Sequence, residues 1–340
     1  MRIALFYPSH IPYSWQLLAE APLGGAETAV LHMARALSEL DHSVEIVRRA
    51  EDLASLGDID VLVLKRHPIL LEDVPTGQVY FWTPDDTDQP SFEPLRNDHY
   101  RAAFLGQVRW VFALSSYQSF QFQALGIPQD RITQTRNGVD LALFSGSDRS
   151  DRAMRCLYTS TPFRGLHVLL SLWPLIHREV PSAELHIYSS MAVYHRSERP
   201  EYEALYELAE RTPGVTHVGS VAQPRLAAAL CEARLWLYPN TFPETSCIAA
   251  MEAQAAGCVL VTSSAGALPE TAAGNLFVHG DPLSRDYLAT FASLAIRLLH
   301  HPEQWEYLSQ RNRTRAQLFD WRDVAREWSL LFEEEARTTP

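Results

Sequence analysis

The sequence is poor in basic residues, and lysine is almost missing from it. Lysine and arginine together number 29 against 41 aspartates and glutamates, which gives a formal net charge of -12 at pH 7. Lys65 is the single lysine of the chain. Proteins that follow a nucleic-acid backbone need a basic surface to neutralise its phosphates. The charge balance therefore excludes nucleic acid as a main partner.

Cysteine is scarce as well. The sequence holds four cysteines, and no two of them form a C-x-x-C pair. Each lies in an apolar stretch, which favours reduced thiols over disulfides or a zinc site. We therefore expect neither a disulfide framework nor a structural metal. The four residues are Cys156, Cys231, Cys247 and Cys258.

Apolar runs long enough to cross a membrane are also missing. The longest, such as residues 61–64, have the length of a strand, whereas a membrane helix needs ~20 apolar residues. The first residues lead directly into an apolar strand pattern, without the charged and apolar regions of a signal peptide. These absences predict a cytoplasmic protein without a transmembrane helix.

Several common catalytic signatures are absent too. The sequence has no G-x-S-x-G and no G-x-x-x-x-G-K-[ST] motif, so serine hydrolase and P-loop functions have no support. Its histidines show no H-E-x-x-H or other metal-ligand spacing. The full G-x-G-x-x-G spacing is missing, which disfavours a nicotinamide-dependent dehydrogenase.

The remaining pattern is that of two α/β domains. A hydrophobic content of 46% can bury a sizeable core, and 340 residues suit two domains of about 150 residues each. Short apolar runs alternate with longer amphipathic stretches, which indicates βαβ units on parallel sheets. We predict strands at residues 2–7, 43–47, 60–64, 78–82, 108–114 and 131–135, then at 155–158, 184–188, 215–218, 235–238, 259–262 and 275–278.

A polar, glycine-containing stretch, residues 145–151, separates the two sets of strands and is the predicted linker. We expect two doubly wound Rossmann-like domains, covering residues 1–145 and 152–320. The tail, residues 302–336, has a helical pattern with no strand after it. Because open parallel sheets bind ligands at the carboxyl ends of their strands, we expect the two domains to face a shared cleft that holds the ligand.

One segment, residues 239–252, combines a loop after a predicted strand with the start of a helix. Thr245 and Ser246 suit the N-cap of that helix, whose free N–H groups and dipole favour an anion. Glu244 lies in the loop beside this anion site, and Glu252 follows among small apolar residues. A buried carboxylate needs hydrogen-bond donors, which the hydroxyl pair of a ribose or hexose supplies. The segment therefore predicts a pocket for a nucleoside-diphosphate sugar, in preference to two solvated surface charges.

Two other loops follow predicted strands in the same way. Gly24 and Gly25 precede a helix, where paired glycines let a phosphate or sugar approach the backbone, although they suit a simple turn equally well. Arg164 begins a helix in the second domain, and its guanidinium can bind a diphosphate bidentately and neutralise charge on a leaving group. Arg164 is therefore a candidate for binding the phosphates, while a ligand contact and a simple turn remain alternatives for Gly24 and Gly25.

Carboxylates also follow a strand of the first domain. Asp85 is a candidate contact for an acceptor hydroxyl, and it is equally suited to cap its own loop. Asp86-Thr87-Asp88 resembles the D-x-D motif that holds a divalent metal in another class of sugar transferase. A hard cation needs more oxygen ligands than this loop supplies, so we predict no metal here.

Taken in order, these segments resemble the family 4 glycosyltransferases, which are retaining enzymes with the GT-B fold. The resemblance covers nearly the whole chain, and the order and spacing of the motifs are more specific than any one of them. Glu244 and Glu252 have the E-x7-E spacing of the family. The other matching stretches are Gly24-Gly25-Ala26-Glu27, Arg136-Asn137-Gly138-Val139-Asp140 with Phe144, Arg164-Gly165-Leu166, and Ser264-Ala265-Gly266-Ala267.

The resemblance implies a nucleotide-sugar donor, most simply a UDP- or GDP-sugar, held mainly by the second domain. It implies a metal-independent reaction in which the leaving phosphate helps to deprotonate the acceptor, and a final helix, residues 321–340, that crosses back to the first domain. The implied roles are ribose binding by Glu252, binding of the transferred sugar by Glu244, diphosphate binding by Arg164, Gly24 and Gly25, backbone N–H contacts from Thr245, Ser246 and Cys247, and lining of the base pocket by Gly219.

Two positions depart from the pattern of the family. Thr159 stands where many members carry a first cation, five residues before the second one, which here is Arg164. Residues 82–85 stand where many members have a histidine, so Asp85 is the candidate for that place. One cation and one histidine are therefore missing from the pattern.

We predict a retaining hexosyltransferase that uses a nucleotide-diphosphate sugar and a saccharide, lipid-linked or small-molecule acceptor in polysaccharide or glycoconjugate biosynthesis. The alternative is a non-catalytic, nucleotide-sugar-binding or regulatory subunit of the same fold, which the two departures favour and the Glu244 and Glu252 pair disfavours. A locally basic first domain also allows peripheral contact with the inner face of a membrane. The basic residues concerned are Arg48, Arg49, Lys65, Arg66, Arg96, Arg101 and Arg109.

Overall fold

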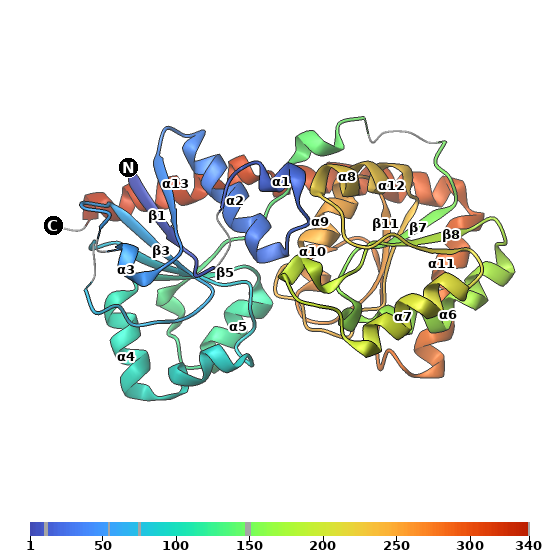
Figure 1. Cartoon of the computed structure of the whole chain (residues 1–340), viewed down its shortest axis with the longest axis horizontal. Helices are drawn as coiled ribbons and strands as arrows, with labels where there is room; N and C mark the ends of the chain where they lie inside the picture. The colour runs from blue at the N-terminus through green and yellow to red at the C-terminus, as the bar shows by residue number, and fades with distance from the viewer. Residues whose placement is uncertain (10–12, 54, 74–75, 147–150, 339–340) are drawn as a thin grey trace. The chain divides into compact units, whose positions relative to one another are not determined.

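The computed structural model describes residues 1–9, 13–53, 55–73, 76–146 and 151–338, so residues 147–150 of the predicted linker lie outside the described part. The chain divides into two compact units, each built on one parallel six-stranded sheet with helices around it (Figure 1). The first unit comprises residues 1–15, 25–138 and 320–340, and the second comprises residues 16–24 and 139–319.

The sheet of the first unit has the strand order β2-β1-β3-β4-β5-β6, and every neighbouring pair is parallel. Apart from Lys65 at the end of β3, its central strands β3 and β4 consist of large apolar residues, and all of their residues are buried, as expected when helices cover both sides of a sheet. The strands are β1 (Arg2–Phe6), β2 (Ser43–Val47), β3 (Val61–Lys65), β4 (Val79–Trp82), β5 (Trp110–Ala113) and β6 (Ile132–Gln134).

The last helix of the chain, α13 (Trp321–Thr338), belongs to the first unit and packs beside α2 (Gly25–Ser38) (Figure 1). Its Trp328 stacks on Phe112 with ring centroids 4.2 Å apart and donates a 2.8 Å hydrogen bond to Thr135. This buried aromatic contact explains why a helical tail without a following strand is stable. The other helices of the unit are α3 (Ala50–Leu53), α4 (Asp98–Gln107) and α5 (Ser116–Ala124).

The sheet of the second unit has the order β12-β11-β10-β7-β8-β9 and is also fully parallel. The chain builds β7, β8 and β9 outward on one side and then returns to lay β10 against the other side of β7. The strands are β7 (Arg155–Tyr158), β8 (Glu184–Ile187), β9 (Val215–His217), β10 (Leu235–Tyr238), β11 (Val259–Ser263) and β12 (Leu276–Val278).

Eight α-helices accompany this sheet among the described residues, and one large core of buried aliphatic and aromatic side chains joins several of them to the strands. They are α1 (Leu17–Glu20), α6 (Leu166–Glu179), α7 (Pro200–Arg211), α8 (Gln223–Glu232), α9 (Ile248–Ala255), α10 (Leu268–Thr271), α11 (Arg285–His300) and α12 (Pro302–Ala316). Short 3-10 helices cover Pro90–Arg96, Gln129–Arg131, Leu141–Phe144, Pro162–Arg164, Met191–Tyr194 and Gln317–Phe319.

All twelve predicted strands are present, and the α/β class is confirmed. The largest difference lies at β5, which begins two residues later than predicted because the amide of Val108 still donates to Phe104 at the end of α4. Residues 16–24, which the sequence places with the first set of strands, group instead with the second unit.

Candidate functional site

The order of strands in the second sheet reverses between β7 and β10. Connections leave these two neighbouring strands in opposite directions, and ligands of open parallel sheets bind at the carboxyl edge beside such a point. Arg164 ends the short helix that follows β7, and Glu244 lies in the loop that follows β10. Two residues predicted from separate motifs are therefore brought to one place.

Arg164 and Glu244 form a buried ion pair. The Arg164 Nη1 donates to Glu244 Oε1 at 2.5 Å, and the two side chains are 21% and 7% exposed. Tyr238, the last residue of β10, donates from its hydroxyl to the same oxygen at 2.6 Å. Burial lowers the pKa of Arg164, but the adjacent carboxylate of Glu244 outweighs it and holds that pKa well above its ordinary value. The site therefore carries a permanent cation.

Aromatic rings flank the same guanidinium. The Arg164 Cζ lies 4.5 Å from the ring centre of Phe242 and 5.6 Å from that of Phe163. Its Nε atom is buried and has no hydrogen-bond partner within the described part of the chain. A buried donor without a partner costs free energy, so an anionic or polar ligand that reaches it gains a hydrogen bond.

Two glycines with left-handed backbones bring these loops together. A Cβ atom on Gly165, whose φ is 103°, would lie 2.1 Å from the carbonyl oxygen of Pro239. A Cβ atom on Gly266 would lie 2.3 Å from the carbonyl oxygen of Glu244, which also accepts a 2.6 Å hydrogen bond from the amide of Ala267. Neither approach leaves room for a side chain, so glycine is required at both positions.

The helix α9 begins one to two residues later than its sequence predicts. Thr245 and Ser246 are expected N-caps, but Cys247 occupies that position, and its carbonyl oxygen accepts from the amides of Ala250 and Met251. The loop after β10 continues through Thr245 and Ser246 because Glu244 is paired with Gly266 beside it. Thr245, Ser246 and Cys247 are all buried.

Glu252 lies inside the second unit, on α9, as the apolar residues around it predict. It is 6% exposed, and its Oε1 accepts a 2.7 Å hydrogen bond from the side-chain amide of Gln223 in the first turn of α8. Burial raises the pKa of Glu252 to about 7, and the hydrogen bond from Gln223 opposes this rise. The carboxylate is therefore poised to change its charge near neutral pH.

The three remaining glycines of the predicted site differ in their placement. Gly219 follows β9 with φ at 79°, and open space surrounds the position of a Cβ atom. Gly25 is the first residue of α2, and Gly24 precedes it, so the boundary between the two compact units runs between them. Their assigned contacts with a nucleotide remain predictions.

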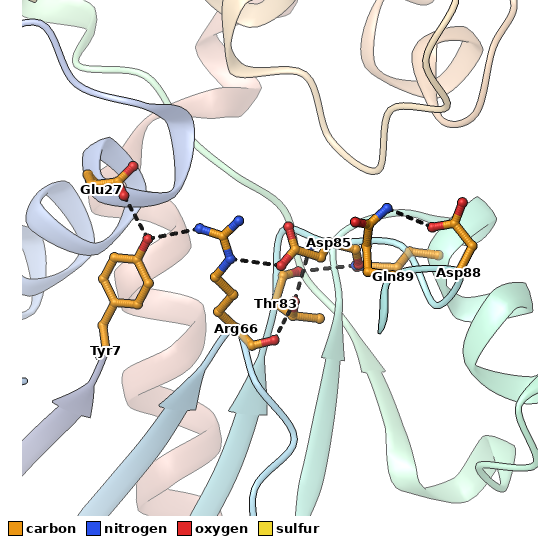
Figure 2. Close-up of polar contacts among 8 residues, drawn as sticks. Tyr7, Glu27, Arg66, Thr83, Asp85, Asp88 and Gln89 are labelled. Atoms are coloured by element: carbon orange, nitrogen blue, oxygen red, sulfur yellow. Dashed lines mark hydrogen bonds and ion pairs between the residues drawn. The ribbon is translucent and has the colours of Figure 1, made fainter. Parts of the chain in front are cut away.

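Asp85 belongs to the first unit and lies apart in the chain from the residues above. Its carboxylate pairs with Arg66 through a 2.9 Å contact between Oδ2 and Nε (Figure 2). Asp86 caps its own loop by accepting from the amide of Thr87 at 2.6 Å and from the hydroxyl of Tyr117 at 2.6 Å. In the described residues no group of three His, Cys, Asp or Glu side chains could hold a metal ion.

The residue at the position of the missing cation, Thr159, makes a structural hydrogen bond instead. Thr159 is buried, and its hydroxyl accepts a 2.8 Å hydrogen bond from the indole of Trp236. A threonine at this position satisfies a core tryptophan and leaves Arg164 as the cation that follows β7.

The basic residues that suggest a membrane-facing surface are largely neutralised within the first unit. Lys65 is buried, and nearly all of the arginines in this predicted surface form ion pairs with carboxylates. The structure therefore does not support a continuous basic face. The pairs are Arg49 with Glu51 and Asp52, Arg66 with Asp85, Arg96 with Glu93, Arg101 with Asp98, and Arg109 with Glu335. Among the described helices, none has both the length and the apolar character that crossing a membrane requires.

Sequence reasoning missed the residues that hold the predicted ones in place. Tyr238 belongs to an apolar strand, where a tyrosine gives the same signal as any core residue. Gln223 follows the edge strand β9 and belongs to no recognisable sequence motif. Arg66 stands next to the lone lysine, and its positive φ of 81° has no signal in the sequence.

Comparison with known proteins supports a relation to sugar transferases. Residues 155–301 match the family model described as glycosyl transferases group 1. One of the subunits of phosphatidylinositol N-acetylglucosaminyltransferase from Arabidopsis thaliana is 23% identical over 216 residues, which cover 61% of this chain. The aligned part spans less than half, 45%, of that relative.

Solved structures match nearly the whole chain. Sucrose-phosphate synthase from Thermosynechococcus elongatus aligns with a TM-score of 0.74 and 17% identity over 99% of this chain and all of that one. HepE from Anabaena, solved in complex with UDP-glucose, aligns with a TM-score of 0.70 and 17% identity over 98% of this chain and all of that one. These matches confirm the predicted architecture of two parallel sheets, the GT-B fold.

Proposed function

We propose that this protein is a retaining glycosyltransferase that moves a hexosyl unit from a nucleoside-diphosphate sugar to a saccharide, lipid-linked or small-molecule acceptor. The observation that carries the proposal is the contact between Arg164 and Glu244 where the order of the second sheet reverses. This pair lies within the stretch that matches the glycosyl transferases group 1 model. A UDP-sugar is the first donor to examine, because HepE was solved with UDP and with UDP-glucose.

The donor site uses the permanent charge of Arg164 and the N-terminus of α9. In the proposal the diphosphate competes with Glu244 for the guanidinium, so that Glu244 is released to accept hydrogen bonds from the hydroxyls of the transferred sugar. The backbone amides of residues 245–247 and the first turn of α9 add favourable dipoles for the phosphates. No metal is assigned, since Arg164 supplies the positive charge.

Glu252 and Gly219 complete the donor site. Ribose hydroxyls donate to the carboxylate of Glu252, which is buried and receives a single hydrogen bond, from Gln223, within the described residues. Gly219 lines the base pocket, where its open backbone allows close approach. Gly24 and Gly25 approach the diphosphate, and Asp85 contacts an acceptor hydroxyl in the first unit.

The transfer step keeps the anomeric configuration. The bond between the anomeric carbon and the β-phosphate oxygen breaks, and a bond between that carbon and the acceptor oxygen forms on the same face. The acceptor proton passes to the leaving phosphate, and Arg164 stabilises the negative charge that develops there. Preorganised charge of this kind is usually the largest contribution to catalysis.

The alternative, a non-catalytic protein that binds a nucleotide sugar, rests on one specific observation. Thr159 fills the place of a second cation and is bound to Trp236, so Arg164 stabilises the leaving group without that neighbour. A protein of this kind would bind the donor through Glu252 and Arg164 and would show neither hydrolysis nor transfer.

The test is a thermal-shift panel of UDP, GDP, ADP, CMP, TDP, NAD and their sugar conjugates, followed by an acceptor screen with the donor that binds. A ligand at 100 times its dissociation constant stabilises by about 2.7 kcal/mol, which is readily measured. We expect a shift with one nucleoside diphosphate that increases with one attached sugar. The Glu252→Ala substitution should abolish this shift. Glu232 is an exposed glutamate on α8 that pairs with Arg155, and the Glu232→Ala substitution should leave the shift unchanged. A shift with NAD alone, or an unchanged shift in Glu252→Ala, would contradict the assignment.

A further inference from the structure

The first sheet also has a point where its strand order reverses, between β1 and β3. Tyr7 follows β1, Arg66 follows β3, and Asp85 lies in the loop after the neighbouring strand β4, so all three lie at the carboxyl edge of the sheet (Figure 2). This is the edge at which open parallel sheets bind ligands. The arrangement therefore gives the first unit a candidate binding site of its own.

A continuous chain of hydrogen bonds links four side chains at this edge. The hydroxyl of Tyr7 donates to Glu27 Oε1 at 2.8 Å and accepts from Arg66 Nη1 at 3.3 Å (Figure 2). Arg66 Nε then donates to Asp85 Oδ2 at 2.9 Å. We call Tyr7, Glu27, Arg66 and Asp85 the β1/β3 cluster. Each member fixes the orientation of the next, so the cluster is preorganised.

The backbone around Arg66 and Asp85 is locked as well. Arg66 has a φ of 81°, a left-handed conformation that a bulky non-glycine residue rarely adopts. The hydroxyl of Thr83 donates to the carbonyl oxygen of Arg66 at 3.1 Å and accepts from the amide of Asp85 at 3.1 Å. The side-chain amide of Gln118 donates to the carbonyl oxygen of Asp85 at 3.0 Å. Backbone strain that is held in this way is typical of functional sites.

The β1/β3 cluster leaves a hydrogen-bond donor and an acceptor open side by side. Arg66 Nη2 and Asp85 Oδ1 have no partner among the residues that the structure describes, and their side chains are 35% and 20% exposed. Glu27 is 9% exposed, and its Oε2 is buried without a partner in the same part of the chain. A ligand that both donates and accepts hydrogen bonds would satisfy Arg66 Nη2 and Asp85 Oδ1.

The charges of the β1/β3 cluster disfavour an anion. Two carboxylates, Glu27 and Asp85, accompany the single guanidinium of Arg66, so the cluster has no positive excess. The nearby Lys65 adds little charge, because burial holds its pKa well below the ordinary value although Asp85 opposes this effect. Within the cluster a phosphate or carboxylate would therefore face two carboxylates and one guanidinium, whereas hydroxyl groups carry no charge for these carboxylates to repel.

We propose that the β1/β3 cluster binds a pair of neighbouring hydroxyl groups on an uncharged saccharide acceptor. Arg66 Nη2 donates to one hydroxyl oxygen, Asp85 Oδ1 accepts from the other hydroxyl, and Tyr7 and Glu27 act as positioning residues for Arg66. This inference rests on the proposed glycosyltransferase function, because it assigns the class of acceptor to that reaction. It adds that glycosides without charge are preferred over acidic ones.

The experiment compares two probes that differ only at C6, where one carries a neutral hydroxymethyl group and the other a carboxylate. Methyl β-glucoside and methyl β-glucuronide are titrated into the full-length protein with UDP present, and binding is followed by NMR of labelled lysine, which gives one side-chain signal because Lys65 is the single lysine. We expect the glucoside to bind at least about tenfold more tightly than the glucuronide. Equal or tighter binding of the glucuronide, or no binding of either probe, would overturn the proposal.

Two matched variants locate the effect. Asp85→Asn removes the carboxylate next to Arg66 and should weaken glucoside binding about tenfold while improving binding of the glucuronide. Asp88→Asn makes the same change on an exposed residue of the same loop that is bonded to Gln89, and should leave both affinities unchanged (Figure 2). If both variants behave alike, the site lies elsewhere.

A third variant keeps the proposal testable if Asp85→Asn does not fold. Tyr7→Phe removes only the hydroxyl between Glu27 and Arg66, and should weaken glucoside binding several-fold without affecting the shift produced by UDP-glucose. If UDP-glucose produced no thermal shift in the unmodified protein, the result would contradict the proposed function itself. A retained shift together with absent glucoside binding would contradict the acceptor site alone.

Discussion

Each of the two sheets places an arginine and a carboxylate where its strand order reverses. The two pairs differ in the distance between their charged groups and in their exposure to solvent. In the second unit Arg164 and Glu244 are 2.5 Å apart, and the side chains are 21% and 7% exposed. In the first unit Arg66 and Asp85 are 2.9 Å apart and 35% and 20% exposed. The same topology therefore builds one buried pair and one that remains open to a ligand.

The surroundings of the two pairs differ more than the pairs themselves. Glu244 is followed by the N-terminus of α9, which favours anions, whereas Arg66 lies between two carboxylates, Asp85 and Glu27. Strand order thus selects the place of a site in each unit, and the neighbouring charges select the ligand. We assign the phosphates to the second unit and the uncharged hydroxyls to the first on this basis.

Replacing each arginine in turn should distinguish the functions of the two sites most strongly. Arg164→Gln removes the cation that we assign to the leaving diphosphate, and we expect turnover to fall by about 10²–10³-fold. Arg66→Gln should leave the affinity for UDP-glucose unchanged and weaken only acceptor binding. Transfer rates together with thermal shifts by UDP-glucose measure both effects. Similar losses of donor binding in the two variants would show that the division of roles is wrong.

Two glycines of the second unit test how tightly its loops are built. Gly165 and Gly219 both have positive φ, but only at Gly165 would a Cβ atom collide with backbone, that of Pro239. We expect Gly165→Ala to destabilise the second unit by about 3 kcal/mol through collision and strain, and Gly219→Ala by about 1 kcal/mol through strain alone. Hydrogen exchange of the amides in β7 and β10 measures both values. Equal losses would indicate that the loops can move apart.

The sequence predicted the parts of the molecule that depend on local pattern. Strands such as β3 and β10 are short apolar runs between polar turns, and their number and positions were confirmed. Arg164 and Glu244 were each selected from a strand-to-helix segment recognisable by itself, whereas their direct contact is seen only in the structure. The burial of Glu252 followed from its small apolar neighbours.

The contacts that depend on strand order could not be predicted. Tyr7, Arg66 and Asp85 are far apart in sequence and meet only because β1, β3 and β4 are adjacent in the sheet. Glu27 lay inside a recognised motif, but nothing in that motif indicated its hydrogen bond to Tyr7. The N-cap of α9 was misplaced because the pairing of Glu244 with Gly266 extends the loop.

Buried titratable groups give the two units opposite responses to pH. Lys65 in the first unit lies 2.9 Å above the ring of Trp82, and its Nζ has no hydrogen-bond partner within the described residues. Because its pKa is lowered in the folded state, the unfolded state binds more protons, and stability should rise with pH from the folded pKa up to about 10.4.

Replacing this lysine should therefore stabilise the first unit. We expect Lys65→Met to gain about 2 kcal/mol at pH 7, since it removes a buried amine without a hydrogen bond. Hydrogen exchange of the amides in β3 measures the gain, and the amides in β10 serve as the internal control. The difference from the unmodified protein should shrink near pH 10, where the amine is neutral in both states. A less stable variant at pH 7 would show that the contact with Trp82 outweighs burial.

Glu252 should give the second unit the opposite dependence. Its pKa is raised to about 7 by burial, so the folded state holds a proton that the unfolded state has already lost, and stability falls as pH rises toward and through 7. In our proposal ribose hydroxyls donate to the ionised form, so the affinity for a nucleotide sugar should instead rise with pH across the same range.

The pH dependence of UDP-glucose binding measures the ionisation of Glu252. UDP-glucose has no phosphate that titrates between pH 6 and pH 8, so a change in its affinity reports on the protein. We expect the affinity to rise about tenfold over this range as Glu252 ionises. Glu252→Gln should bind weakly and without pH dependence, whereas Glu232→Gln should keep the full profile because that carboxylate is exposed beside Arg155. A profile that persists in Glu252→Gln would assign the titration to another group and separate Glu252 from the ribose.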